Sequence, residues 1–236
     1  MPRFRRKPAS SSPGEDKGDR RREQLLELGL RLFGDRSYAE ISIDDIAEAA
    51  SISRGLLYHY FKGKRGFYND TVRFAAERLV QRVRTSDTLE PEQRTRAGIN
   101  AYLEYVESFA GAYVVLMRGG LGVEAHVRGI LEDAREAIVS HMIADGPGLA
   151  RTPAVHAALR GWLHLVEGMS LDWLETREVT RPALVEILTS ALWTIVETAM
   201  AVDAGEPAPT RVNPFATGDA GVHSGGIGDS ISASTK

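Results

Sequence analysis

The chain has 236 residues, of which 43% are hydrophobic, enough to bury a sizeable core in one large domain or two small ones. No apolar run approaches the roughly 18 residues of a membrane span, and no signal-peptide segment is seen at the amino end, so we expect a cytoplasmic protein without a membrane partner. The lack of cysteine excludes disulfides and Cys-based zinc sites. Residues 1–84 hold 18 Lys and Arg against 12 Asp and Glu, whereas residues 85–236 hold 11 against 20, and contact with phosphates requires a basic region of this kind.

Residues 1–19 are rich in Arg, Ser, Pro and Gly and have little to bury. We predict a disordered basic arm there, which could lie along DNA or act only as a solvated tail. A first helix is predicted at about residues 20–34, where Leu25, Leu28, Leu32 and Phe33 recur on one side. Three arginines at 20–22 stand at its predicted start, where positive charge opposes the helix dipole, and this favours a functional reason for them.

Two short helices are predicted next, in close succession. Ser42 can cap the first, with Asp45 three residues on as the second half of a capping box. Ser53 can cap the second, which carries Leu57 and Phe61 toward an apolar interior. Short helices joined by so tight a turn indicate a helix-turn-helix, a motif whose second helix enters the major groove of DNA by its N-terminal residues.

The stretch from Ile43 to Lys64 resembles the signature of TetR-family transcriptional regulators, and the resemblance extends over roughly residues 21–79. Its most specific part is Leu-Tyr-His-Tyr-Phe-Lys-Gly-Lys at residues 57–64. The resemblance implies an all-α fold, a two-fold dimer and DNA binding controlled by a ligand. Two positions depart from the commonest pattern: Leu56 replaces a small or hydroxylated residue that faces the groove, and Gly63 replaces Ser or Asp and is an acceptable N-cap.

The candidate DNA contacts lie in and around the second short helix. Arg54 is the candidate base reader, because its forked guanidinium can bond both acceptors on a guanine edge. Gly55 would allow close approach of the backbone, Leu56 could meet a thymine methyl, and Ser42 could hold a phosphate at a capped helix start. The resemblance implies that Tyr58, His59 and Lys64 contact the DNA backbone. Tyr60 could equally be a core residue. The predicted set is Ser42, Ser53, Arg54, Gly55, Leu56, Tyr58, His59, Tyr60 and Lys64.

Beyond this motif, apolar residues at helical spacing predict helices at about 64–85, 92–110, 123–144, 152–176 and 181–202, with a short apolar segment at 113–118. The last two helices are apolar over more than one stripe, so we expect them to form a four-helix dimer interface through Leu159, Val166, Leu188, Leu192 and Ile195. We thus predict about nine helices arranged as an arm (1–19), a three-helix DNA-binding domain (20–64), a ligand-binding and dimerisation domain (65–202) and a disordered tail (203–236).

A second candidate site is a chamber between the C-terminal helices, because binding pockets are mostly apolar with a few polar groups that fix orientation. Its predicted lining is Tyr105, Phe109, Tyr113, Met117, Ile138, Trp162, Leu165, Met169 and Trp173, with Arg118 and His164 as polar anchors. Plain core packing is the alternative for each of these residues. The lining suits a small lipophilic effector, such as a fatty acyl derivative or a planar drug.

Catalysis has little support in the sequence. The six histidines are scattered and none lies in a His-Glu-x-x-His array, so we expect no metal site, no cofactor and no enzyme. The sequence predicts a homodimeric regulator that binds a palindromic double-stranded DNA operator, first of all as a repressor that the effector releases. The alternatives are a ligand sensor of the same fold that acts through a protein partner, and an all-α enzyme that uses the chamber.

Overall fold

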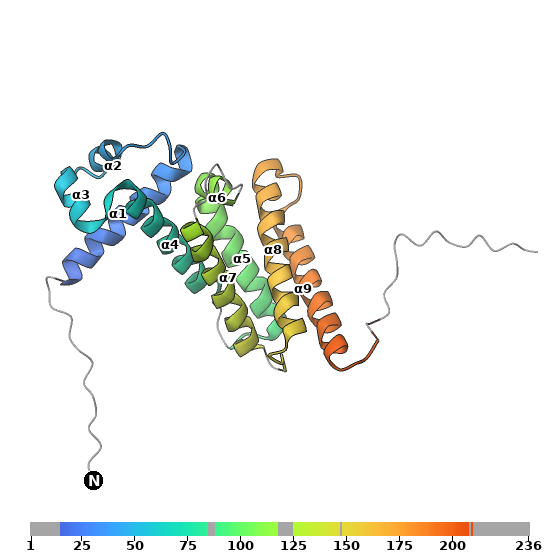
Figure 1. The fold of residues 1–236 in the computed structure, drawn as a ribbon. Helices are drawn as coiled ribbons and strands as arrows, with labels where there is room; N and C mark the ends of the chain where they lie inside the picture. Colours follow the sequence, from blue (N-terminus) through green and yellow to red (C-terminus); the bar gives the residue numbers. More distant parts are fainter. Residues whose placement is uncertain (1–14, 85–87, 118–124, 147, 208, 210–236) are drawn as a thin grey trace, which may run out of the picture.

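The computed structural model of the protein describes residues 15–84, 88–117, 125–146, 148–207 and 209. Within these ranges all regular structure is helical, which confirms the predicted all-α class. Figure 1 shows α1, α2 and α3 grouped at one end, α5 to α9 bundled at the other, and α4 running between them. The helices are α1 (Glu15–Asp35), α2 (Ile43–Ala49), α3 (Arg54–Tyr60), α4 (Gly63–Val83), α5 (Pro91–Ser108), α6 (Ala110–Met117), α7 (Ala125–Asp145), α8 (Pro153–Thr176) and α9 (Arg181–Asp203).

The N-terminal group is held together by its own apolar core. Leu26 of α1 packs with Ile46 of α2 and Leu57 of α3, and each of the three is at most 2% exposed. Phe61 and Phe67 meet edge to face in this core, with ring centroids 4.9 Å apart. Since short helices are marginal alone, this shared core is what keeps α2 and α3 folded and fixes the angle between them.

Two details of this region differ from the expectation. Helix α1 begins at Glu15 rather than near residue 20, because its first turns are polar and carry no apolar period for the sequence to reveal. Gly63 is not an N-cap: it is the first residue of α4 and has φ 78°, a left-handed conformation that glycine adopts without a Cβ penalty. Most of the predicted arm and tail, residues 1–14 and 210–236, lies outside the described residues.

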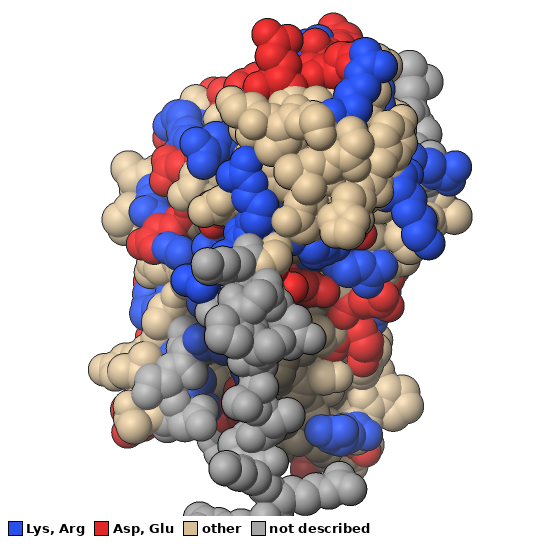
Figure 2. Space-filling view, turned by 90° about the vertical axis from the view of Figure 1, so that its left-hand side faces the viewer, with Lys and Arg blue, Asp and Glu red and all other residues tan. Residues whose placement is uncertain are grey.

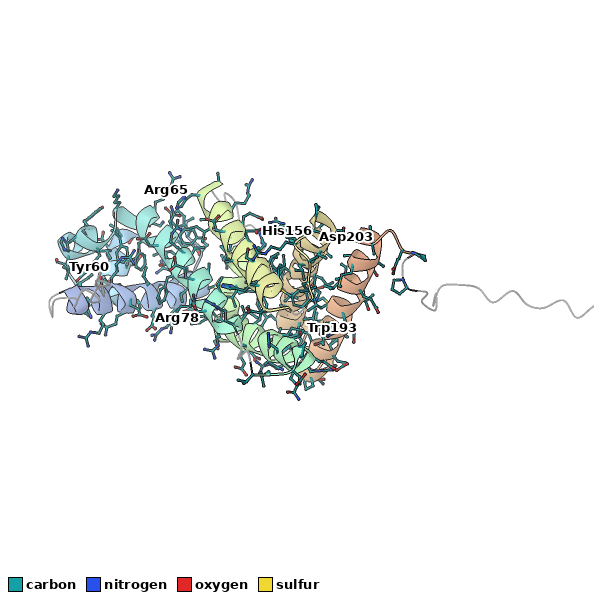
Figure 3. All side chains as sticks on the ribbon, turned by 90° about the horizontal axis from the view of Figure 1, so that it is seen from below. Tyr60, Arg65, Arg78, His156, Trp193 and Asp203 are labelled. Atoms are coloured by element: carbon teal, nitrogen blue, oxygen red, sulfur yellow. The ribbon has the colours of Figure 1, made fainter. Side chains whose placement is uncertain are left out.

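The C-terminal helices surround a second core. Helices α8 and α9 pack closely along their length, α5 lies against α9, and α7 packs against both α4 and α8. Leu103, Leu159 and Leu188, from α5, α8 and α9, are fully buried at its centre. Figure 3 shows the resulting elongated molecule, with Tyr60 in the N-terminal unit and Asp203 toward the opposite end.

The residues expected at a dimer interface are mostly in this core instead. Leu159, Val166, Leu188 and Leu192 are between 0% and 5% exposed within a single chain, so they cannot meet a partner subunit. Only Ile195 reaches the surface, where it is 36% exposed. The prediction was wrong because α8 and α9 bury their main stripes against each other and against α5.

Helix α9 is long and apolar enough to cross a membrane by length and composition alone. Its contacts with α8 and α5 give these apolar residues another role, as part of the protein core. The apolar residues of α9 that this core does not bury lie on the flanks of the helix, where Ile187, Trp193 and Met200 are each more than 40% exposed. Because α9 packs within the bundle, the apolar composition of this helix is weak support for a membrane span.

Candidate nucleic-acid interface and effector cavity

Helix α2 starts with the capping box that the sequence predicted. The Oγ atom of Ser42 accepts a hydrogen bond from the backbone N–H of Asp45 at 3.0 Å, and the Ser42 N–H donates to the Asp45 carboxylate at 2.7 Å. These hydrogen bonds hold the pKa of Asp45 below its ordinary value, with a smaller contribution from the nearby Arg36. Ser42 is exposed at the helix start, where it could also meet a phosphate.

Helix α3 separates a buried side from an exposed one. Ser53 caps it by accepting from the N–H of Leu56 at 3.2 Å, and Leu57 anchors it in the core with no exposed surface. On the open side, Leu56 is 39% and Tyr58 57% exposed. Large apolar and aromatic side chains this exposed on one side of a short helix are available for an external partner.

The other predicted contacts of α3 are divided between surface and interior. Gly55 and His59 are exposed, whereas Tyr60 is half-buried against the core that holds Phe61. Arg54 is exposed on 63% of its side chain and forms an ion pair through Nε with the carboxylate of Asp44 on α2. The open side of α3 thus gathers most of the predicted contact residues on one surface.

Lys64, predicted to contact the DNA backbone, has a second partner within the protein. Its Nζ atom lies 4.2 Å from the ring centroid of Tyr38, a cation–π contact that holds the side chain in place. Two of the three arginines early in α1 are similarly occupied: Arg22 pairs with Asp70 at 2.7 Å, and Arg21 donates to the Ala50 carbonyl at 3.4 Å. These arginines join α1 to α2 and α4, so a structural role accounts for them.

Figure 2 shows the molecule from the end that carries α2 and α3. Lys and Arg side chains frame an area of uncharged surface, and a group of Asp and Glu side chains gathers along the upper edge. Helix α2 contributes acidic residues to this end, with Asp44 and Asp45 in its first turn and Glu48 one turn further on. The face therefore has basic flanks beside an acidic margin, and only part of it suits a polyanion.

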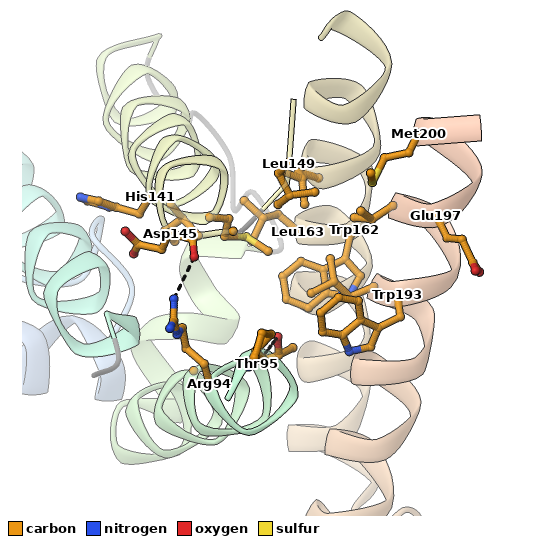
Figure 4. Close-up of a pocket in the computed structure, with 18 of the residues that line it drawn as sticks. Arg94, Thr95, His141, Asp145, Leu149, Trp162, Leu163, Trp193, Glu197 and Met200 are labelled. Atoms are coloured by element: carbon orange, nitrogen blue, oxygen red, sulfur yellow. Dashed lines mark hydrogen bonds between the residues drawn. The ribbon is translucent and has the colours of Figure 1, made fainter. Parts of the chain in front are cut away.

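A cavity of about 1010 Å³ lies in the C-terminal bundle, between α5, α7, α8 and α9. Figure 4 shows Trp162 of α8 beside Trp193 of α9 on one side of it, with Arg94 of α5 and Asp145 of α7 opposite. Arg94 donates through Nη1 to the Asp145 backbone carbonyl at 2.8 Å, which ties α5 to the end of α7. The cavity is apolar at its centre and polar at its rim, as expected for a small-molecule site.

A smaller cavity of about 110 Å³ lies closer to the N-terminal group of helices and is lined by residues of α1, α4, α5, α6, α7 and α8. Tyr102, Ile138 and Leu163 line both cavities and so form the partition between them. The smaller cavity touches α1 through Leu30 and Phe33. Phe33 also belongs to the apolar core of the N-terminal group, so the smaller cavity borders that core.

The predicted chamber residues are distributed over these two cavities and beyond them. Of the predicted set, Ile138 and Trp162 line the large cavity, and Tyr105, Phe109, Tyr113, Met117 and Ile138 line the small one. Leu165 is 41% exposed, and neither it nor Met169 nor Trp173 lines either of these two cavities. His164 is exposed and Arg118 lies outside the described residues.

Trp173 has a different role, at the turn from α8 to α9. Its Nε1 donates to the Val179 carbonyl at 2.9 Å, and the guanidinium of Arg177 lies 4.1 Å from its ring centroid. Sequence reasoning also missed Arg94, His141 and Trp193 as lining residues. The signal that could have found Trp193 is its spacing, because Trp193, Val196 and Met200 recur at three- and four-residue steps and all line the larger cavity.

The partition carries a buried polar network. Tyr113 of α6 donates through its hydroxyl to the Glu167 backbone carbonyl at 3.2 Å, so the Tyr102 hydroxyl, 2.8 Å from that of Tyr113, donates to it. Burial raises the pKa of Tyr102 well above its ordinary value. The Glu167 carboxylate in turn accepts from Arg135 of α7 at 2.8 and 3.0 Å. Four helices thus meet through one set of hydrogen bonds.

Helix α6 also contacts α1 of the N-terminal group directly. A Cβ atom placed on Gly111 would stand 3.0 Å from the carbonyl carbon of Gly34 in α1, and closer still to its oxygen. The backbones of α1 and α6 can approach this closely because Gly34 and Gly111 carry no side chain. Helix α6 therefore connects the hydrogen-bonded partition to the end of α1.

Comparison with known proteins agrees with this arrangement. A family model described as bacterial regulatory proteins of the tetR family matches residues 25–71, and one described as the tetracyclin repressor-like C-terminal domain matches residues 91–195. The chain is 28% identical over 181 residues to the HTH-type transcriptional activator FasR of Mycolicibacterium smegmatis, which covers 74% of this chain and 82% of that protein.

Two solved structures share the fold. A tetR-family transcriptional regulator from Streptomyces coelicolor is 31% identical, with a TM-score of 0.66 over 79% of this chain and 83% of its own. The regulator FadR from Bacillus subtilis in complex with stearoyl-CoA is 14% identical, with a TM-score of 0.59 over 74% of this chain and 97% of its own. The family consists of transcriptional regulators rather than enzymes. The chain belongs to the TetR family of transcriptional regulators.

Proposed function

We propose that the protein acts in the cytoplasm as a homodimer that binds a palindromic operator and releases it when a small lipophilic effector occupies the large cavity. The observation that supports this most strongly is the open side of α3, where Arg54, Leu56 and Tyr58 are exposed above a fully buried Leu57. In this proposal residues 20–64 read DNA and residues 65–202 bind the effector and the partner subunit.

The DNA contacts proposed are those predicted from the sequence, with α3 in the major groove. Arg54 would read a guanine, and Tyr58, His59 and the start of α2 at Ser42 would contact phosphates. Lys64 is engaged with Tyr38, so its contact with DNA would be a shared one. Each dimer would present two α3 helices to half-sites about 34–36 Å apart, one turn of the duplex.

The partner subunit is proposed to cover the exposed flanks of α8 and α9. On α8, Gly161, Leu165 and Gly168 lie on one side, and a Cβ added to either glycine would meet nothing within 4 Å. On α9, Ile187 and Ile195 are 45% and 36% exposed. Small residues let two helix pairs approach closely, and the apolar neighbours supply the area to be buried.

The effector proposed is an apolar molecule, with a long-chain acyl derivative as the first to test. The cavity of about 1010 Å³ is large enough for such a ligand, and Trp162, Leu163 and Met142 give it an apolar wall. The structural neighbour FadR was solved with stearoyl-CoA, which shows that this fold can hold an acyl chain in that protein. Release of DNA requires that the effector bind the released state more tightly than the DNA-bound one. The opposite preference would make the protein an activator.

The effector would act through the partition between the cavities. A ligand that displaces Tyr102 disturbs its hydrogen bond to Tyr113 and so moves α6, which abuts α1 at Gly34. A shift of α1 carries α3 with it, because the two share one core. The distance between the two recognition helices then no longer matches the operator.

The proposal is tested by selecting genomic fragments with the purified protein and titrating the best fragment in gel shifts at several salt concentrations. We expect a sequence-selective, salt-sensitive shift, because part of the affinity comes from phosphate contacts. A protein that binds all fragments equally, or none, refutes the operator part of the proposal. Native mass spectrometry of the purified protein tests the effector part, through co-purifying lipophiles and through added stearoyl-CoA.

A further inference from the structure

The ion pair between Arg54 and Asp44 lies on the surface that we assign to DNA. Arg54 is the first residue of α3, and Asp44 stands in the first turn of α2, so the pair joins the two helices of the motif. Both side chains are exposed on more than half of their surface. We propose that Asp44 is a positioning residue that orients Arg54 for reading a guanine, and this rests on the proposed DNA binding.

The geometry of the pair suits this role. The carboxylate of Asp44 lies against Nε of Arg54, the guanidinium nitrogen nearest the chain. The attraction between the two charges holds the guanidinium beside α2 and so limits the directions in which its terminal N–H groups point. Those groups are the ones that bond O6 and N7 of guanine. Limiting these directions in advance also reduces the side-chain freedom lost on binding.

Stability alone does not account for the pair. An exposed ion pair contributes little to folding, because water screens it. Arg54 also stands where the helix dipole disfavours a positive charge, whereas Asp44 stands where a negative charge is favoured. Finally, a carboxylate on this surface repels phosphates, which weakens binding to any duplex. An acidic residue that weakens binding to every sequence while orienting the base reader raises the ratio of specific to nonspecific binding.

The test compares Asp44→Ala with Glu48→Ala, a matched control that removes the same charge one turn further along the same side of α2. Affinities are measured for the selected operator, for operators substituted at each guanine, and for a shuffled duplex. We expect both variants to bind the shuffled duplex more tightly than the wild type. Only Asp44→Ala should lose discrimination at the guanine read by Arg54, by about twofold to tenfold, which is the cost of leaving one side chain to be ordered on binding. Asp44→Glu keeps the charge and should restore part of it.

A double-mutant cycle shows whether the effect passes through Arg54. In an Arg54→Ala background, Asp44→Ala should cause no further loss of discrimination. An equal loss in that background, or unchanged discrimination in Asp44→Ala alone, overturns the inference. Circular dichroism and thermal unfolding confirm that each variant is folded. If the wild type itself prefers no sequence, the proposed function fails as well, whereas a selective wild type with a selective Asp44→Ala variant refutes the positioning role alone.

Discussion

The contact between α1 and α6 gives the sharpest test of how the two halves of the chain are coupled, through the substitution Gly111→Ala. The added Cβ would stand 3.0 Å from the Gly34 carbonyl carbon, whereas carbon atoms in contact are about 3.5–4.0 Å apart. The helices must therefore separate by at least about 0.5 Å. Overpacking of this kind costs about 1–3 kcal/mol, while replacing glycine by alanine inside a helix gains about 0.5–1 kcal/mol.

Gly129→Ala in α7 is the matched control for Gly111→Ala, because a Cβ there meets nothing within 4 Å. Gly129→Ala gains the helix propensity without the clash, so the difference between the two variants isolates the overpacking. For a chain of this size we expect that difference to appear as roughly 2–12 °C in the melting temperature. Operator affinity, measured by fluorescence anisotropy without effector, should fall in Gly111→Ala and stay unchanged in Gly129→Ala.

The result that would refute this reasoning is a Gly111→Ala protein that melts and binds operator as Gly129→Ala does. Helix α6 would then not be in firm contact with α1, and the route from the cavity to DNA would need another element. Loss of stability with unchanged operator affinity would be equally informative. It would show that the contact supports the fold and does not set the position of α3.

Three further predictions concern the partner face, the cavity and the capping box. Leu165→Arg should be a monomer by light scattering at micromolar concentration, because it places a charge in the proposed dimer interface. Val179→Arg, which is equally exposed but lies in the turn before α9, should remain dimeric. A dimeric Leu165→Arg would contradict the proposed interface. Trp193→Ala should weaken binding of stearoyl-CoA by about fivefold or more, while the protein stays folded because the side chain is 43% exposed and outside the fully buried core. Unaltered binding would exclude Trp193 from the site. Asp45→Asn should lower the free energy of unfolding at neutral pH, because the folded-state pKa of Asp45 is depressed. The carboxylate of Asp45 therefore stabilises the fold at pH values above its unfolded pKa, and this stabilisation is lost as the pH falls through the folded pKa. Urea titrations that show the same difference in stability between the variant and the wild type at every pH would contradict this.

The sequence was sufficient to predict the helix-turn-helix because its signals are local. Ser42 and Ser53 cap helices within three residues of themselves, and both bonds are present in the structure. The bounds of the later helices also follow from local features, such as Pro153 and Pro182 in first turns after capping threonines. Features that depend on neighbours along the chain can be derived without knowing the tertiary packing.

The partner of an apolar stripe could not be derived in this way. Leu188 and Leu192 have the spacing of an interface, but the same spacing serves for contact with α8 of the same chain. Ile187 and Ile195 lie beside them on α9 and are the exposed ones. Periodicity identifies a buried face and does not say which helix covers it.

The predicted chamber placed Trp162 and Trp173 in one lining, and the length of α8 separates them. Trp162 and Trp173 are eleven residues apart on α8, which corresponds to about 16 Å along a helix. Only Trp162 reaches the large cavity, while Trp173 closes the turn to α9.

The ion pair of Asp44 with Arg54 could not be predicted from the sequence either, because it depends on the angle between α2 and α3.

The central claim is that the exposed side of α3 reads a DNA sequence, and one measurement tests it most directly. Fluorescence anisotropy titrations of the wild type and Arg54→Ala are compared on the selected operator, on operators substituted at each base pair and on a shuffled duplex. The account predicts a selective wild type and an Arg54→Ala protein that loses about 1–3 kcal/mol of discrimination at one position. Equal affinity of the wild type for the operator and the shuffled duplex would contradict it.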